Sequence, residues 1–278
     1  MPVHDDLGTR MKTYYEQIPK TKLIRRMPVI IRIDGKAFHT FTRGFKKPFD
    51  EILIQSMQET TKYLCENIQG CVLGYTQSDE ITLVLVDYQR FETSAWFDYE
   101  VQKMCSIAAS MATMAFNKIF VKNVSEVYKN RYKEEGKCLM PYDLYKTYQN
   151  AIDKGAMFDA RVFNIPKEEV TNCIYWRQLD ASRNSIQMVG QANFSHKELQ
   201  NKSCSNIQDM LMTQKGINWN DFPTYQKRGS CVIKEEYKDH SVLPDMAITR
   251  TRWIIDKEIP IFKGEGRNYI DQLVFVGE

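Results

Sequence analysis

The fold is decided by the stretch VIIRIDG, residues 29–35, which follows Pro28. A short apolar run that is rich in β-branched side chains predicts a strand buried in a sheet. The run stops at Asp34-Gly35, a pair that is typical of a turn. We therefore expect a core strand that ends in a carboxylate.

Outward from this strand, the spacing of apolar residues predicts an alternation of helices and strands. Near-3.6 spacing predicts helices over 53–68 and 96–120, and short apolar runs predict strands over 71–75, 81–86 and 158–163. This β-α-β-β-α-β order is that of the ferredoxin-like fold. In that fold the sheet is antiparallel, both helices cover one face, and the other face is open for a ligand. The predicted class is therefore α+β.

The domain organisation follows from the same pattern. Residues 1–195 are expected to form the core, with a helix over 166–181. A polar, Tyr- and Lys-rich helical insertion at about 123–153 is expected to leave that core. Residues 196–278 are expected to form a C-terminal extension packed on it, with two short strands near Cys231 and Trp253.

Composition excludes several classes of protein. The 278 residues are 43% hydrophobic and 26% charged, which excludes a disordered chain. No apolar run approaches about 18 residues and the N-terminus lacks a secretory core, so we expect a cytoplasmic protein that crosses no membrane. The net charge of +3 is too small to indicate a nucleic-acid-binding protein by bulk charge, but it does not exclude a local basic surface. The seven cysteines form no C-x-x-C pair, which disfavours a zinc site.

Two aspartates are the candidate catalytic residues. Asp34 ends the first strand and Asp79 begins the second strand of the predicted hairpin, so neighbouring strands can bring both carboxylates together. Two adjacent carboxylates are costly unless a cation neutralises them, and oxygen ligands favour Mg²⁺. If the strand is regular, Glu80 points to the opposite face, and we expect Asp79 to be the partner of Asp34. An ordinary turn and an exposed hairpin corner remain the alternative.

The loop after the first strand is a candidate phosphate site. Its backbone N–H groups can form a nest for a triphosphate over Gly35-Lys36-Ala37-Phe38-His39. Lys47 can pair with phosphate, although a solvated loop lysine is the commoner role. His39 can contact a base or a phosphate, or be structural. The chain has no G-x-x-x-x-G-K-[ST] stretch, so it is not a P-loop protein.

Several stretches, in order along the chain, carry a resemblance to a known family. They are DLGTRMK (6–12), RIDGKAFHTF (32–41), KP (47–48), GYTQSDE (74–80), FDARVF (158–163), PTYQKRGS (223–230) and IPIF (259–262). Together they resemble the tRNA-His guanylyltransferase superfamily. Where the eukaryotic-type enzymes carry Asp-Cys-His-Ile-Asn-Asn, this chain has DASRNS (180–185), which is similar to the bacterial-type branch.

The resemblance implies a nucleotidyltransferase with a core similar to a polymerase palm. It implies template-dependent, 3′-to-5′ addition of nucleotides to the 5′ end of tRNA, either to repair a truncated end or to add G to tRNA-His. ATP would activate the 5′-phosphate, and GTP or another NTP would supply the nucleotide. By matching position, two Mg²⁺ ions would be held by Asp34, the Gly35 carbonyl and Asp79. Catalysis would also involve Glu80, and the triphosphate would be held by Lys47, Ser78, Asp79 and the loop from Asp34 to His39.

The resemblance also implies tRNA as partner and a homotetramer whose C-terminal extension contacts tRNA and forms subunit interfaces. The candidate tRNA contacts are Arg26, Lys46, Lys197, Lys227 and Arg228, each of which is also consistent with a plain surface charge. Two rival functions stay open. A palm-fold nucleotide cyclase would use the same acidic positions, whereas a non-catalytic tRNA-binding protein would not need both aspartates.

Overall fold

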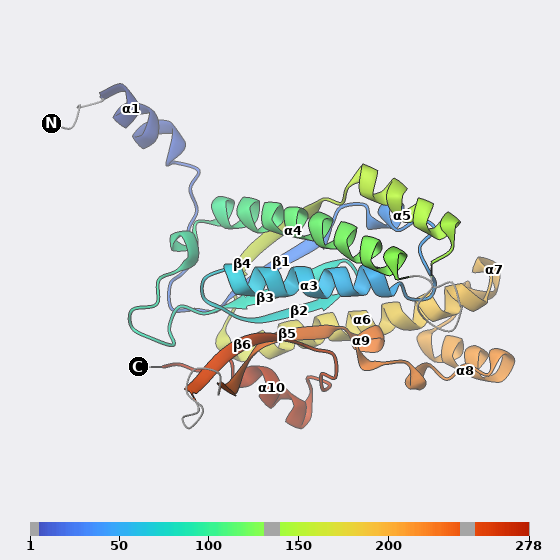
Figure 1. Ribbon diagram of the computed structural model, residues 1–278. Coiled ribbons are helices and arrows are strands. Elements are labelled where there is room, and N and C mark those ends of the chain that lie inside the picture. The colour runs from blue at the N-terminus through green and yellow to red at the C-terminus, as the bar shows by residue number, and fades with distance from the viewer. Residues whose placement is uncertain (1–5, 131–139, 240–247, 278) are drawn as a thin grey trace.

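The computed structural model describes residues 6–130, 140–239 and 248–277 (Figure 1). Its centre is a six-stranded antiparallel sheet in the order β4-β1-β3-β2-β5-β6. The first strands and the two helices between them are β1 (Val29–Gly35), α3 (Glu51–Asn67), β2 (Cys71–Gln77), β3 (Glu80–Leu85), α4 (Val101–Lys129) and β4 (Phe158–Asn164). This order confirms the predicted ferredoxin-like core.

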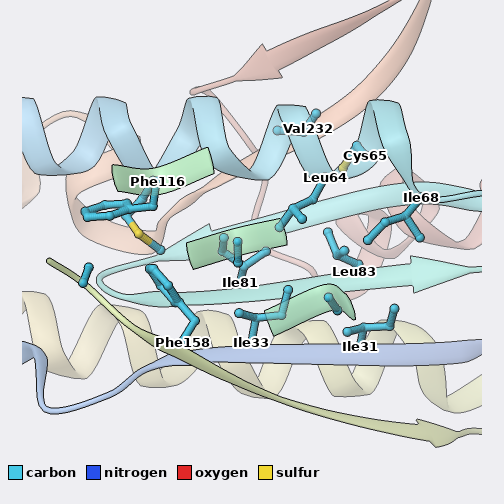
Figure 2. Packing of buried hydrophobic residues seen from close by; sticks show 14 of the residues in the cluster. Ile31, Ile33, Leu64, Cys65, Ile68, Ile81, Leu83, Phe116, Phe158 and Val232 are labelled. Atoms are coloured by element: carbon cyan, nitrogen blue, oxygen red, sulfur yellow. The ribbon is translucent and has the colours of Figure 1, made fainter. Parts of the chain in front are cut away.

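Helices α3 and α4 cover one face of the sheet, here called the first face (Figure 1). Strand alternation sends Ile31 and Ile33 of β1 to this face, where they are fully buried together with Ile81 and Leu83 of β3. Phe116 of α4 packs in the same cluster (Figure 2). Burying each such side chain stabilises the fold by about 1.5–3 kcal/mol, so this layer contributes strongly to the stability of the fold.

The second face of the sheet is not open along most of its length, contrary to the prediction. Ile30 and Val84 alternate with the residues of the first face and are fully buried on this side. They are covered by α6 (Val170–Asn193), through Ile174, and by side chains of residues 259–274. Because both faces of these strands carry apolar residues, both need a cover. The helix predicted over 166–181 begins later, at Val170, and continues to Asn193.

Part of the segment predicted to leave the core, residues 131–139, lies outside the described residues, and the described parts, 123–130 and 140–153, contribute to the core instead. α4 begins later than predicted because a 3₁₀ turn occupies Trp96–Tyr99, and it continues beyond residue 123. α5 (Tyr142–Lys154) packs back on α4, and Val124 and Tyr148 are fully buried in the first-face cluster. In the described part of the chain, α4 alone is long and apolar enough to cross a membrane; here it is a core helix.

The chain after residue 195 packs on the core in two places. β5 (Ser230–Asp239) and β6 (Ile248–Asp256) extend the sheet beyond β2, so the two predicted late strands exist and are longer than expected. α8 (Cys204–Lys215) packs on the second half of α6. The remaining short α-helices are α1 (Asp6–Met11), α2 (Phe38–Phe41), α7 (His196–Leu199), α9 (Thr224–Arg228) and α10 (Asn268–Asp271). The boundary at residue 195 stays a prediction.

Candidate active site

Asp34 lies near the end of β1 on the second face, where the apolar cover of the sheet gives way to charged side chains. In the strand register it is opposite Glu80 of β3 and Asp159 of β4. Opposite residues of antiparallel strands share a face. The premise that Glu80 points to the face opposite Asp34 is therefore wrong, whereas Asp79 as the cation-binding partner of Asp34 stays a prediction. β3 begins at Glu80, so strand alternation does not apply to Asp79, which lies in the turn.

The turn between β2 and β3 brings Asp79 to the end of β1. The backbone carbonyl of Asp79 accepts a hydrogen bond of 3.1 Å from the backbone N–H of Gly35. Ser78 adopts a left-handed backbone conformation, with φ of 49°, which is uncommon for a residue other than glycine. Its hydroxyl donates to the Asp79 carboxylate over 3.0 Å. This geometry fixes Asp79 beside Gly35 and next to Asp34.

Both aspartates have pKa values raised above the ordinary range. Burial is the first cause for Asp34, and the charges of Glu80 and Asp159 raise its pKa further. Burial also raises the pKa of Asp79, the hydrogen bond from Ser78 opposes that rise, and the charge of Asp34 adds to it. The two carboxylates are thus close enough to repel each other, which is the arrangement that a bound cation would relieve.

The donor set fits Mg²⁺. Two carboxylates and the Gly35 carbonyl offer only oxygen atoms, which magnesium prefers. Within the described residues no three His, Cys, Asp or Glu side chains gather as a metal cluster. Two carboxylates and one carbonyl would fill only part of a magnesium shell. Mg²⁺ usually keeps several waters and takes further oxygens from substrate phosphates, so a partial shell is the expected one.

Glu80 is buried and held by arginines. Its two carboxylate oxygens accept from Nε and Nη2 of Arg177 over 2.5 and 2.6 Å, and Arg32 lies 3.3 Å away. Arg177 also donates to Asp180, over 2.9 Å. This engagement favours an orienting role for Glu80, with Asp34 and Asp79 left to bind a cation. Sequence reasoning missed Arg177, because its partner lies 97 positions away.

A cavity of about 540 Å³ opens beside Asp79. It gathers residues of the predicted phosphate loop with the hairpin turn and α6. Its lining includes Gly35, Ala37, Phe38, His39, Lys46, Lys47, Ser78, Asp79, Met188 and Gln191. Two of the predicted nucleotide-binding residues lie outside this lining. Asp34 points to the second face of the sheet, and the exposed Lys36 donates its backbone N–H to the carbonyl of Met157 over 2.8 Å.

The conformation of the loop that lines the cavity depends on the side chains that pack between it and the core. A Cβ at Gly35 would collide with the ring of Phe38, so glycine is required there for space. Phe38 is itself buried against Phe41, Phe116 and Phe158, which makes it a core residue beneath the loop. Ala37 between them is left-handed, with φ of 53°, and is followed by a helical turn. Such a sequence of conformations turns successive N–H groups toward one side, as a nest requires.

The predicted tRNA contacts lie on four separate segments of the chain, and their role stays a prediction. Lys46 lines the cavity, but the exposed Lys197 belongs to α7. Lys227 donates to the carbonyl of Asn220, and it lies on α9 together with Arg228. Arg26 precedes the other end of β1, where its backbone N–H donates to Asp87 over 2.9 Å. β1 separates it from Asp34 by roughly 20 Å.

Comparison with known proteins identifies the family. A family profile described as tRNAHis guanylyltransferase matches residues 8–166, more than half of the chain. The chain belongs to the tRNA-His guanylyltransferase family. It is therefore a nucleotidyltransferase.

Solved structures support the same assignment. A bacterial tRNA-His guanylyltransferase-like protein in complex with ATP has a TM-score of 0.77, is 44% identical, and matches over 98% of this chain and 100% of its own. A bacterial protein of the same description in complex with GTP has a TM-score of 0.75 and is 39% identical, with the same coverage of both chains. The tRNA-His guanylyltransferase of Saccharomyces cerevisiae shares the fold, with a TM-score of 0.59 and 21% identity over 79% of this chain and 91% of its own.

Curated relatives outside bacteria are more distant. An uncharacterised protein of Acanthamoeba polyphaga mimivirus is 28% identical over 86% of this chain and 81% of its own. The tRNA-His guanylyltransferase of Saccharomyces cerevisiae is 24% identical over 74% of this chain and 82% of its own. The identity is higher with the bacterial guanylyltransferase-like proteins than with these relatives.

The stretch in which this chain departs from the eukaryotic-type pattern lies on α6, close to the active site. Asp180 is bound by Arg177, which also holds Glu80. Ser182 donates its hydroxyl to the carbonyl of Gln178 over 3.1 Å, within the helix. Ser185 accepts from the indole Nε1 of Trp219 over 3.0 Å. The two serines are therefore used in local packing.

Proposed function

We propose that this protein adds nucleotides to the 5′ end of truncated tRNA in the 3′-to-5′ direction, with the opposite strand as template. The observation that carries the proposal is the cavity lined by Lys46, Lys47, Ser78 and Asp79, adjoining Asp34. Its volume suits a nucleoside triphosphate. The bacterial relatives solved with ATP and with GTP support nucleotides as its occupants.

The chemical problem is that a 5′-monophosphate carries no good leaving group. In the first step an oxygen of this phosphate attacks the α-phosphorus of ATP, and pyrophosphate leaves. In the second step the 3′-hydroxyl of GTP or another NTP attacks the activated 5′-phosphorus, loses its proton and expels AMP. An end that already carries a triphosphate needs only the second step, with pyrophosphate leaving.

In both steps the protein positions groups and neutralises charge. Lys46 and Lys47 would hold the triphosphate oxygens, and the backbone N–H groups of the Ala37 nest would hold a further phosphate. Asp34, Asp79 and the Gly35 carbonyl would hold magnesium, which lowers the pKa of an attacking hydroxyl and neutralises phosphate charge when it is bound. Glu80 would keep Arg177 and Arg32 in place beside the reacting ends.

Selection of the nucleotide by base pairing requires the protein to bind tRNA by backbone and shape. Ser182 and Ser185 stand where the eukaryotic-type pattern has His and Asn, which supports a broader choice of tRNA than tRNA-His alone. The proposal includes a cytoplasmic homotetramer in which the extension 196–278 contacts tRNA and a neighbouring copy. Light scattering of the purified protein, free and with tRNA, measures that assembly.

The decisive assay uses tRNAs that lack one or two 5′ nucleotides, ATP and each labelled NTP in turn. We expect the RNA to gain the nucleotide that pairs with the opposite base, and a change of that base to change the nucleotide added. A tRNA-His lacking its extra G tests addition to that tRNA. A cyclic nucleotide formed from GTP without RNA would support a cyclase instead. Bound tRNA that never gains a label would support a non-catalytic binding protein.

A further inference from the structure

Trp176 is a large aromatic side chain that the active site described above does not use. It lies in the first half of α6 and is 52% exposed, although the adjacent Arg177 is buried. An exposed indole on a helix that otherwise packs against a sheet is available to a ligand. Its position relative to Asp34 makes it more than an isolated surface residue.

Two guanidinium groups hold the indole in place. The guanidinium carbon of Arg177 lies 4.4 Å from the ring centroid and that of Arg32 lies 5.2 Å from it. Both arginines also hold the same oxygen of Glu80, at 2.6 and 3.3 Å, which restrains the two guanidinium groups beside the ring. The ring is therefore fixed before any ligand arrives, which lowers the entropic cost of binding to its exposed part.

The indole and the triphosphate cavity lie on opposite sides of the catalytic carboxylates. Arg32, which touches Trp176, is two residues from Asp34 on the same face of β1, a separation of about 7 Å. Met188, which lines the cavity, lies on α6 about 18 Å beyond Trp176. A nucleotide in the cavity therefore approaches Asp79 from one side. The other side, where Trp176 lies, is available to a second substrate.

The surroundings of the indole are electrically balanced. Glu80 pairs with Arg32 and Arg177, and Asp180 pairs with Arg177 and the exposed Arg183. Asp34, whose charge interacts with Arg32, makes three acids against three arginines. The recognition element is thus the ring itself rather than a net positive charge. Every nucleobase has a π-face, so stacking on an aromatic ring tolerates any sequence. An enzyme that selects the added nucleotide by base pairing needs a contact of this kind, which binds every base alike.

We propose that the terminal base pair of the tRNA acceptor end stacks on Trp176 and that this contact places the 5′-phosphate at Asp34 and Asp79. This inference rests on the proposed function and names the RNA contact within it. The adenine of the activating ATP is the other source of a stacking base. The proposed function already assigns the cavity beside Asp79 to a nucleotide, so the RNA end is the occupant that the geometry favours for Trp176.

The test compares Trp176→Ala with Trp176→Tyr in the full-length protein. For Trp176→Ala we expect the KM for truncated tRNA and the Kd for the same tRNA without nucleotides to rise about tenfold. The KM values for ATP and GTP stay unchanged. Trp176→Tyr keeps an aromatic face and restores most of the tRNA affinity. The matched control is Leu179→Ala, a 51% exposed residue one turn along the same helix, which leaves all values unchanged.

Three results would overturn the inference: an unchanged KM and Kd for tRNA in Trp176→Ala, a rise in the KM for ATP alone, or a change of oligomeric mass by light scattering. The second would assign the ring to the adenine of ATP, and the third to contact between copies. Failure of the proposed function is separate. If the wild-type protein extends no tRNA, that function is wrong, while the tRNA Kd of Trp176→Ala still tests the stacking contact.

Discussion

The two faces of the central sheet differ although the same strands build them. On β1, Ile31 and Ile33 point to the first face, which is apolar along its length. Ile30, Arg32 and Asp34 point to the second face, which is apolar at one end and charged at the other. The site is thus placed where the apolar cover of one face ends, on strands whose opposite face is fully packed.

The charged end of the second face is arranged for function at some cost to stability. Burial and like charges raise the pKa values of Asp34 and Asp79, so both ionised carboxylates disfavour the metal-free fold. A buried ion pair such as Glu80 with Arg177 is weak evidence for added stability. The comparison therefore predicts that changes on the first face affect stability alone, whereas changes at the charged end of the second face affect activity and, through its buried charges, stability as well.

The largest effect is expected for Asp79→Ala, which removes one of the two aspartates. Nucleotide addition to truncated tRNA should fall by at least about 10²–10³-fold, because a charged group at the reacting centre is lost. tRNA binding should survive. Single-turnover assays and filter binding measure the two quantities, with Asp143→Ala, an exposed aspartate on α5, as the matched control. Full activity in Asp79→Ala would disprove the assignment of the cation site.

On the first face, Met104→Ala of α4 should leave a cavity in the apolar cluster and lower the free energy of unfolding by about 2–5 kcal/mol. Activity per folded molecule should change little. Urea denaturation measures the loss, with the exposed Met114→Ala on the same helix expected within about 0.5 kcal/mol of wild type. A large activity loss without loss of stability would contradict the division between the faces.

A third experiment tests the buried pair on the second face. Glu80→Gln leaves Arg177 and Arg32 with an unmatched buried charge and should lower the free energy of unfolding by about 3 kcal/mol. The double variant Glu80→Gln with Arg177→Met should recover much of that loss while activity stays low. A double-mutant cycle from urea denaturation gives the coupling energy. Purely additive effects would show that the pair is not a unit.

The smallest effect is a gain in stability. Asp34→Asn removes a carboxylate whose pKa is raised in the folded state, and should raise the free energy of unfolding of the metal-free protein by about 0.5–1 kcal/mol at pH 8. A raised pKa in the folded state means that protonation of Asp34 stabilises the fold. The free energy of unfolding that the wild-type protein lacks relative to Asp34→Asn therefore grows as pH rises through the pKa of the folded state. The gain should therefore shrink at pH 5. Urea denaturation with a chelator at both pH values measures it, and an equal gain at both would refute the cause.

Much of the fold was predictable because it depends on local periodicity. The positions of β1 to β4 and of α3 follow from alternation and 3.6 spacing, which each segment carries in itself. Less predictable was the length of α4, whose continuation packs with α5 into the core. The cover of the second face was also missed, because the need for it arises only when Ile30 and Val84 stand side by side on paired strands.

The candidate site divides in the same way. The phosphate loop, Lys47 and Ser78-Asp79 were identified as stretches of sequence, and the structure gathers them at one cavity. The partner of Glu80 was not identified, because Arg177 belongs to a helix 97 positions away. Trp176 was not singled out either, since its exposure and its two flanking arginines exist only in the folded protein.

The amino-acid sequence alone thus determined which segments become strands and helices and which short stretches carry acids and phosphate-binding groups, because these properties reside in neighbouring residues. Tertiary structure alone decided which face of the sheet holds the charged groups, which arginine neutralises Glu80, and where the open indole lies relative to Asp34. Those relations join residues far apart in the chain. They depend on strand register and on the position of α6 on the sheet, which are fixed only when the whole core packs.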